Sequence, residues 1–273
     1  MYHIGLGPEH LEGNGGRGRY VLLPGDRSRA ERIAARFEGC QHLPNARGHD
    51  SHLGRLRPAD GSEPVDVLAI SSGMGPASVE IIVTELIDCG ARRIVRVGSS
   101  ASMSPKLPPG SALVVTGAVR DEATSDRWTP TAFPALSHPA AVAAMQRGAT
   151  TAGLAEHTYA GLCHSKDSLF GRELGRGPLT PDNQRYVEVL KASGVLATEM
   201  EASTLFVLAS VASAQAVQPI SRGPSAVPVQ AACVLAIYGE PGSEVTALAD
   251  QRAITVACQG VLAWASGDAA STA

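Results

Sequence analysis

Short apolar runs alternate with segments of helical periodicity along this chain. The runs Tyr20–Leu23, Val65–Ile70 and Arg93–Val97 each stop at a glycine-containing turn. Between them, residues 29–37 and about 77–89 carry apolar side chains at the spacing of an amphipathic helix. A buried strand, a glycine turn, a helix and a second buried strand form the repeating unit of a parallel sheet covered by helices. The pattern therefore predicts an α/β fold.

The rest of the chain continues the α/β pattern. We expect strands at 112–116 and 234–237, helices at about 140–152, 202–211 and 243–264, and an ordered loop over 123–139. Residues 214–231 place three prolines among small polar residues, which predicts a surface insertion. The polar tail at 266–273 is expected to fray. No linker separates two apolar cores, so residues 1–273 are predicted to form a single domain.

Composition and charge narrow the class of protein. Hydrophobic residues make up 44% of the 273 residues and the net charge is −3, as in a soluble globular protein. A nucleic-acid surface would need clustered basic residues, and no apolar run approaches the roughly 20 residues that span a bilayer. We therefore expect neither a nucleic-acid nor a membrane partner. The N-terminus shows no signal-peptide pattern, and the five scattered cysteines favour a reducing cytoplasm over a disulfide framework or a zinc site.

A glycine-arginine turn follows the first predicted strand. Gly25 lets backbone N–H groups approach an anion, and the N-terminus of the next helix adds partial positive charge. Arg29, in the first helical turn, can bind two oxygens of a phosphate. The turn thus predicts a phosphate site, although a tight turn with solvated arginines explains the same residues. Asp26 is expected to cap the helix rather than to bind ligand.

One arginine stands inside a predicted buried strand. Arg96 has only apolar neighbours on the strand, where an unpaired charge costs several kcal/mol. Ser99 and Ser100 follow with hydroxyl donors, an arrangement that fits a bound anion. A structural ion pair with a carboxylate is the alternative.

Two carboxylates precede an apolar helix. Glu199 and Glu201 flank Met200 where a short apolar segment turns into the predicted helix. Because side chains two positions apart on such a turn point different ways, one carboxylate can face a pocket while the other braces it. A carboxylate accepts two hydrogen bonds and is a usual partner of vicinal sugar hydroxyls. The alternative is a helix start at which the dipole favours acids.

Four motifs occur in order along the chain. They are Pro-Gly-Asp-x-x-Arg at 24–29, Ser-Gly-Met-Gly at 72–75, a Glu-Leu…Gly…Arg-x-Gly pattern at 85–98, and Glu-Met-Glu at 199–201. Together they resemble the nucleoside phosphorylase superfamily. Further segments resemble its uridine phosphorylase branch: 2–6, 118–121, 133–135 and 165–168. Each motif is weak by itself, but their joint order over nearly 200 residues is specific.

The resemblance implies a fold and a set of site residues. The fold is a central mixed, mostly parallel sheet, distorted toward a barrel and flanked by helices. Catalytic roles fall on Arg96, Arg29 and Glu201. The implied phosphate ligands are Gly25, Arg29, Arg96, Ser99 and a neighbouring subunit's Arg47, and the implied ribose ligands are Glu199, Met200, Glu201 and a neighbour's His3. A homodimer is then the minimal unit and a hexamer the expected assembly.

The implied reaction is phosphorolysis. Inorganic phosphate, as co-substrate, would displace the base of a pyrimidine nucleoside, with uridine expected, and give free base and pentose 1-phosphate. Neither a metal nor an organic cofactor is expected. Two alternatives within the fold are a phosphorylase for purine or other nucleosides and a nucleosidase that uses water. A third is a nucleoside-binding relative that has lost turnover.

The base pocket departs from the family pattern. Ser100, Phe170 and Arg172 are the candidates for contact with the base. Arg172 stands at about the position of a family glutamine. The strand near residues 235–240 lacks both the Ser-Asp of the purine enzymes, whose Asp is the acid, and the Asn-Arg of typical uridine phosphorylases. Arg172 can serve a base carbonyl, or it can be a solvated loop residue beside Glu173.

Overall fold

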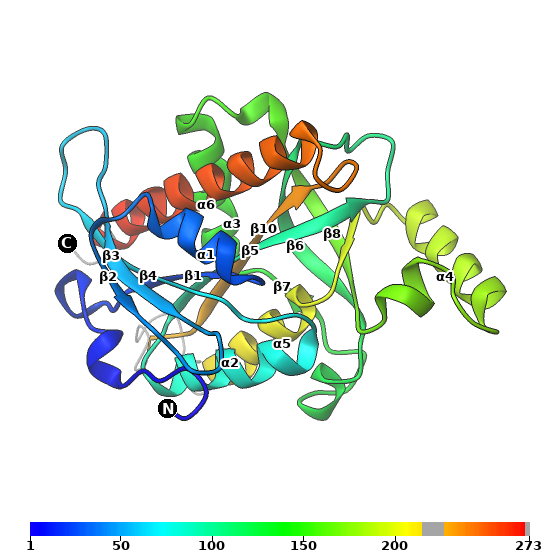
Figure 1. The fold of residues 1–273 in the computed structure, drawn as a ribbon, viewed down its shortest axis with the longest axis horizontal. Helices are drawn as coiled ribbons and strands as arrows, with labels where there is room; N and C mark the ends of the chain where they lie inside the picture. The colour runs from blue at the N-terminus through cyan, green and yellow to red at the C-terminus, as the bar shows by residue number, and fades with distance from the viewer. Residues whose placement is uncertain (215–226, 271–273) are drawn as a thin grey trace, which may run out of the picture.

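The computed structural model describes residues 1–214 and 227–270. Within them, ten strands form one mixed sheet (Figure 1). In chain order they are β1 Tyr20–Pro24, β2 Glu38–Leu43, β3 Ser51–Leu56, β4 Val65–Ile70, β5 Arg93–Ser102, β6 Ala112–Asp121, β7 Ala135–Leu136, β8 Thr158–Lys166, β9 Ala197–Glu199 and β10 Gln230–Ile237.

The sheet closes on itself over half of its width. Its order is β10-β6-β8-β9-β5-β1-β4-β3-β2, and β10 also pairs with β5. Strands β5, β10, β6, β8 and β9 therefore form a ring, and β1, β4, β3 and β2 extend from it. Strand β9 runs antiparallel to β5 and parallel to β8. The predicted mixed, barrel-like sheet is confirmed.

Helices cover the sheet in two layers (Figure 1). One apolar core joins the sheet to α2 and α5, through residues such as Leu86 and Phe206. The other joins it to α1, α3 and α6, through residues such as Ile33, Met145 and Trp264. The six α-helices of the described residues are α1 Arg27–Ala34, α2 Pro76–Asp88, α3 Pro139–Thr151, α4 Thr180–Ala192, α5 Ala202–Ser213 and α6 Glu244–Ala270.

Several elements differ from the expectation, and most of them bear polar residues. Strands β5 and β6 continue beyond their apolar halves to Ser102 and Asp121. Strand β2 is mostly exposed, and α4 fully buries only Leu190, so neither has a clear apolar stripe. Strand β8 ends in buried polar side chains, which apolar periodicity does not mark. Within the expected loop 123–139 the chain forms a turn of 3-10 helix and the short strand β7.

Two predicted irregular segments are partly regular. Helix α6 runs to Ala270, beyond the end of its apolar pattern. The expectation of fraying from residue 266 is therefore wrong for residues 266–270. Residues 271–273 lie outside the described residues. The predicted insertion 214–231 is wrong at its end, because Gln230 and Ala231 already pair with β5 in β10. Residues 215–226 of that prediction lie outside the described residues.

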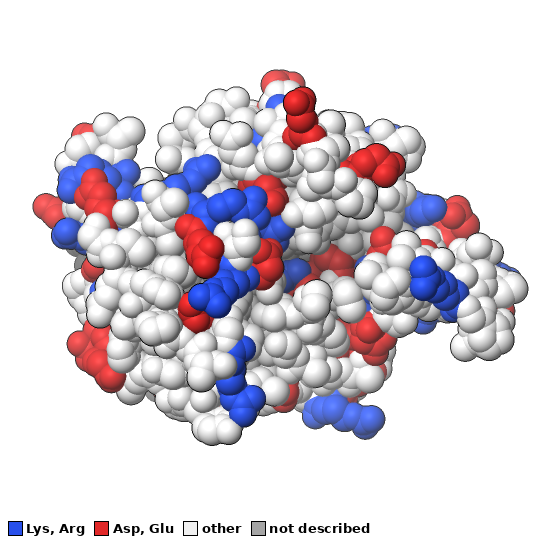
Figure 2. All heavy atoms as spheres, viewed as in Figure 1, with Lys and Arg blue, Asp and Glu red and all other residues white. Residues whose placement is uncertain are grey.

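The surface mixes charges of both signs. Figure 2 shows Lys and Arg side chains interspersed with Asp and Glu on the viewed face, in keeping with a net charge of −3. Over residues 1–214 and 227–270, none of the helices has both the length and the apolar character needed to cross a bilayer.

The contact between α3 and α6 requires glycine. A Cβ built on Gly148 would lie 2.2 Å from the backbone nitrogen of Gly260, so any side chain there would push the helices apart. We expect Gly148→Ala to lower the free energy of unfolding by about 1–3 kcal/mol through overpacking. Gly267→Ala in the same α6 is the control, because its nearest neighbour would be 3.8 Å away. Chemical denaturation measures both, and equal effects would contradict the close contact.

Candidate active site

A cavity of about 530 Å³ lies where β1, β8 and β9 end beside the middle of β5. Eight residues predicted for the site line it: Gly25, Arg29, Arg96, Ser99, Ser100, Glu199, Met200 and Glu201. They come from segments far apart in sequence, and the pairing of β1 and β9 with β5 brings them together. Most of the predicted site residues thus line one cavity.

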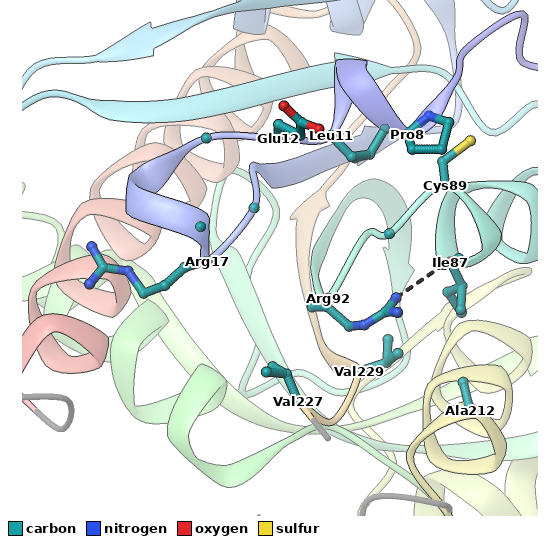
Figure 3. Close-up of a pocket in the computed structure, with 14 residues that line it drawn as sticks. Pro8, Leu11, Glu12, Arg17, Ile87, Cys89, Arg92, Ala212, Val227 and Val229 are labelled. Carbon is teal, nitrogen blue, oxygen red and sulfur yellow. Dashed lines mark hydrogen bonds between the residues drawn. The ribbon is translucent and has the colours of Figure 1, made fainter. Parts of the chain in front are cut away.

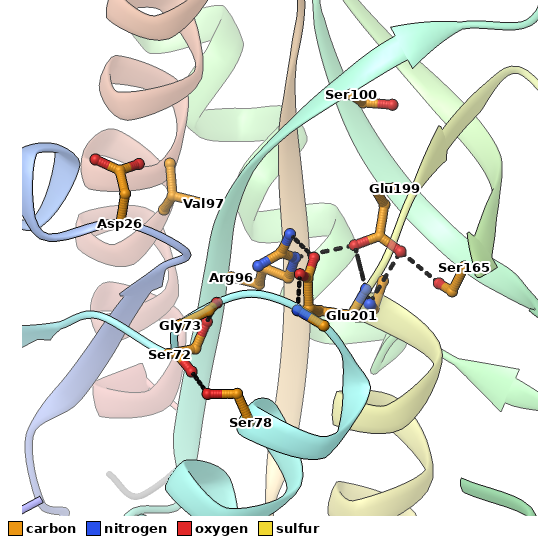
Figure 4. Close-up of polar contacts among 12 residues, drawn as sticks. Asp26, Ser72, Gly73, Ser78, Arg96, Val97, Ser100, Ser165, Glu199 and Glu201 are labelled. Atoms are coloured by element: carbon orange, nitrogen blue, oxygen red, sulfur yellow. Dashed lines mark hydrogen bonds and ion pairs between the residues drawn. The ribbon is translucent and has the colours of Figure 1, made fainter. Parts of the chain in front are cut away.

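Arg96 lies between two carboxylates (Figure 4). Its Nε donates to Glu199 Oε2 at 3.0 Å, and its Nη2 donates to Glu201 Oε2. All three side chains are almost fully buried. Burial alone would lower the pKa of Arg96, but the two carboxylates outweigh it and raise that pKa. The structural ion pair that was an alternative to an anion site is therefore present.

Glu199 is the bracing carboxylate of the pair. It accepts hydrogen bonds from the backbone N–H groups of Glu201 and Ala202 at 2.9 and 3.0 Å and from the Ser165 hydroxyl, in addition to Arg96. These contacts satisfy the first N–H groups of α5, as a carboxylate at a helix N-terminus does. Both Glu199 oxygens are occupied inside the protein, so the side chain holds the turn rather than presenting a free acceptor.

Glu201 is the carboxylate closer to a ligand role. It binds Arg96 through Oε2 and accepts the Gly75 N–H at 2.6 Å through Oε1. Burial raises the pKa of its carboxyl group, and the Arg96 charge opposes that rise. Glu201 has two protein donors where Glu199 has four, and its side chain keeps 7% exposure where that of Glu199 has none, so Glu201 has the greater capacity to accept from a ligand.

Arg96 keeps one donor for an incoming group. Its Nη1 is buried and has no hydrogen-bond partner. This atom points toward Gly25, since a Cβ built there would lie 3.9 Å from Nη1. At Gly98 a Cβ would come within 2.8 Å of Nη2, so the guanidinium occupies the space that a side chain would need. An anion between Gly25 and Arg96 would satisfy the buried donor.

Arg29 is held for a similar task. Its Nη2 donates to Asp250 at 2.9 Å and to the Tyr238 hydroxyl, and its Nε is buried without a partner. Asp26 caps α1 by accepting the Arg29 N–H at 2.8 Å, as expected. Arg29 is 3% exposed, so the alternative of a solvated arginine is wrong.

His3 and Arg47 lie outside this cavity and close to each other. His3 binds Glu85 through its Nδ1 at 2.7 Å, and its carbonyl accepts from Asn45. The exposed Arg47 donates to the Tyr2 hydroxyl at 2.9 Å and stacks on that ring. Both side chains therefore belong to one surface cluster of their own subunit.

Arg172 and Phe170 also lie outside the cavity lining. Arg172 makes a two-point ion pair with Asp121, at 2.7 and 2.9 Å, and donates to Asn183. Because these contacts occupy its guanidinium, it is neither a solvated arginine nor turned toward a base. Phe170 is half exposed and lies under the Arg176 guanidinium. Of the three predicted base contacts, Ser100 alone lines the cavity.

Ten residues outside the predicted site also line the cavity, among them the polar Lys166, Glu173, Thr198 and Tyr238. Lys166 is 1% exposed, at the end of β8. A buried cation at a strand end is the same signal that marked Arg96, and it stands inside the recognised segment 165–168.

A larger cavity, of about 820 Å³, lies on another part of the molecule (Figure 3). It is lined by residues such as Leu11, Arg17, Ile87 and Arg92, and Val227 at its edge adjoins the undescribed residues 215–226. None of the predicted site residues lines it. Size alone therefore does not select the active site.

Comparison with known proteins decides the family. A family model described as "Phosphorylase superfamily" matches residues 19–221, most of the chain. The chain belongs to the phosphorylase superfamily. The matched range contains Gly25, Arg29, Arg96 and Glu201, so the predicted nucleoside phosphorylase family and enzyme class are confirmed.

Similar proteins cover most of this phosphorylase. The uridine phosphorylase of Treponema pallidum is 35% identical over 77% of this chain and 76% of its own. That of Thermococcus kodakarensis is 30% identical over 77% and 72%, and a guanosine phosphorylase of Halorubrum lacusprofundi is 27% identical over 69% and 71%. A crystal structure of Vibrio fischeri uridine phosphorylase, complexed with 6-hydroxy-1-naphthoic acid, has a TM-score of 0.73 and covers 96% of both chains at 22% identity, which shows the shared fold.

Substitution of Glu199 should mainly lower the stability of the protein, whereas substitution of Glu201 should mainly lower its activity. In Glu199→Gln one oxygen becomes an NH2 donor facing other donors, so we expect the free energy of unfolding to fall by about 2–4 kcal/mol. In Glu201→Gln we expect a smaller loss, of about 1–2 kcal/mol, because its carboxylate meets two protein donors where Glu199 meets four. Denaturation and nucleoside cleavage assays measure the two effects. A larger stability loss for Glu201→Gln would reverse the assigned roles.

Proposed function

We propose that this phosphorylase cleaves uridine with inorganic phosphate, giving uracil and ribose 1-phosphate. The observation that carries the proposal is the unpartnered Nη1 of Arg96, buried beside Gly25 and next to the Glu201 carboxylate. A phosphate oxygen would complete the arginine, and a sugar hydroxyl would reach the glutamate. The similarity to uridine phosphorylases supplies the choice of base.

The cavity by itself is short of positive charge for phosphate. Three cationic side chains line it (Arg29, Arg96 and Lys166) against four carboxylates (Asp26, Glu173, Glu199 and Glu201). Arg29 is further offset by Asp250. A phosphate carries one to two negative charges, so its binding calls for a further cation. We propose that the Arg47 of a neighbouring subunit supplies it.

The His3–Arg47 cluster suits donation to a neighbour. Glu85 and Asn45 fasten the N-terminal residues to the body of the subunit, so the cluster is pre-formed before subunits meet. We propose a homodimer as the minimal active unit and a hexamer as the assembly. We further propose that the enzyme acts in the cytoplasm, in pyrimidine salvage, where its free cysteines would stay reduced.

Catalysis then rests on positioning and charge. Phosphate held by Arg29 and Arg96 attacks the anomeric carbon, and its negative charge stabilises the cationic sugar that forms as the glycosidic bond breaks. Glu201 accepts hydrogen bonds from ribose hydroxyls and fixes the sugar for attack, a positioning effect that can contribute several kcal/mol. Because Arg96 binds both Glu201 and the phosphate site, it sets the distance between sugar and nucleophile.

Dependence on phosphate tests the reaction. With uridine as substrate, we expect uracil release only when phosphate is present, with one ribose 1-phosphate formed per uracil. Chromatography of the base and a colorimetric assay of phosphate consumption measure both products. A panel with cytidine, inosine and guanosine tests the base. Uracil release at the same rate in phosphate-free buffer would identify a nucleosidase and overturn the proposal.

Mixing of variants tests the shared site. We expect Arg47→Ala and Glu201→Gln each to be nearly inactive, but subunits of the two kinds mixed by co-expression to regain about a quarter of wild-type activity. The estimate follows from symmetry, because half of random dimers are mixed and each holds one intact site. A mixture of Arg29→Ala with Glu201→Gln is the control and should stay inactive. Full activity of Arg47→Ala alone would show that the neighbour's arginine is not needed.

A further inference from the structure

The cavity contains an ion pair that the phosphate and sugar chemistry does not use. Lys166 Nζ lies 2.7 Å from Glu173 Oε2, and both residues line the cavity. They come from the end of β8 and from the π-helical turn Leu169–Glu173 that follows it. The neighbouring strands run in the order β1, β5, β9, β8. In this order β9, which leads into Glu201, lies between the strand that carries Lys166 and the strands that lead to the Gly25 turn.

This order matches that of a nucleoside bound next to phosphate, in which the ribose lies between the phosphate and the base. Phosphate occupies the end of β1, the ribose lies at Glu201 after β9, and the base would then extend toward β8. Leu169 adds an apolar contact on that side. The Lys166–Glu173 pair therefore lies where a base edge would arrive.

A chain of hydrogen bonds fixes Lys166. Its Nζ donates to Thr198 Oγ1 at 2.9 Å and to the Glu199 carbonyl at 3.2 Å, and it forms the ion pair with Glu173 Oε2. Thr198 in turn faces His164 Nδ1 at 3.1 Å, and His164 Nε2 faces Asp121 at 2.8 Å. Every donor in this series meets an acceptor when the Thr198 hydroxyl donates to His164 Nδ1 and His164 Nε2–H donates to Asp121. The Lys166 ammonium group thus has three partners within the protein, two hydrogen-bond acceptors and one carboxylate.

Glu173 is held from two sides and keeps an oxygen for a ligand. Lys166 binds Oε2, and no hydrogen bond of the described residues occupies Oε1. The preceding residue, Arg172, anchors the turn to β6 through its two-point pair with Asp121. Glu173 retains 23% side-chain exposure, toward the cavity that it lines. A carboxylate fixed in this way offers an acceptor and no donor.

We propose that Glu173, positioned by Lys166, accepts the ring N–H of a lactam base and so selects uracil or a 6-oxopurine over cytosine or adenine. The inference rests on the proposed function, because it takes the cavity to hold a nucleoside. Uracil carries an N3–H between two carbonyls, whereas cytosine has a bare N3 acceptor that a carboxylate repels. Arg172, the sequence candidate for this task, instead holds the turn that carries Glu173.

Glu173→Gln is the sharpest variant. Lys166 has only donors to offer, so it will keep the amide oxygen and turn the NH2 group toward the base. We expect kcat/KM for uridine to fall about 10–100-fold, the usual effect of replacing a matched hydrogen bond by a mismatch. For 3-methyluridine, which has no N3–H, wild type and variant should agree within about threefold. Glu188→Gln, on the exposed α4, is the matched control and should leave both substrates unchanged.

Variants of Lys166 test its positioning role. Lys166→Met has a similar volume and removes the ammonium, so the ratio of kcat/KM for uridine to that for 3-methyluridine should approach one. Lys166→Arg should recover part of that ratio. Thermal unfolding shows whether each variant is folded. An equal fall for both substrates in Glu173→Gln, or an unchanged uridine value, would overturn the inference.

Binding of free bases separates this inference from the proposed function. Calorimetric titration of wild type and Glu173→Gln with uracil and 3-methyluracil requires no turnover. If uridine is not cleaved but wild type binds uracil at least tenfold more tightly than 3-methyluracil and the variant does not, the base assignment holds and the reaction proposal fails. If uridine is cleaved and the two bases bind equally, the reaction holds and the Glu173 assignment fails.

Discussion

The placement of Arg96 between Glu199 and Glu201 is the constraint on which the site depends. Removing such a charge from water costs several kcal/mol unless partners surround it. Here the partners are two carboxylates on a turn 103 and 105 residues further along the chain. The contact fixes β9 against β5, and Glu199 also satisfies the first N–H groups of α5. One buried triad thus ties strand pairing, helix start and cavity together.

The same triad prepares the chemistry. A buried guanidinium with one free donor and two occupied ones cannot swing away, so little reorganisation is needed when an anion arrives. Arg29 on α1 is held in a similar way by Asp250 and by the cavity residue Tyr238. Contacts within the fold offset the cost of burying these charges, and Arg96 Nη1 and Arg29 Nε are the buried donors left without a hydrogen-bond partner.

A second buried polar chain runs beside the triad. Its contacts run from Asp121 to His164, then to Thr198 and Lys166, and end at Glu173. Thr198 adjoins Glu199 on β9, so the two networks share one short strand. A shift of β9 would therefore move Glu199 and Glu201 directly and would disturb the Lys166–Glu173 pair through Thr198.

The sequence alone determined the layers of the fold and the phosphate end of the site. Apolar runs marked the buried halves of β1, β4 and β5, and Arg96 was conspicuous because a charge in such a run needs a partner. The tertiary structure decided what local pattern does not encode. Glu199 braces and Glu201 faces the cavity because β9 returns antiparallel to β5. Arg172 turns to Asp121, and Lys166 meets Glu173, because the π-helical turn folds back over β8. These side chains were visible in the sequence, but their partners lie on other strands, and only closure of the sheet sets which ones meet.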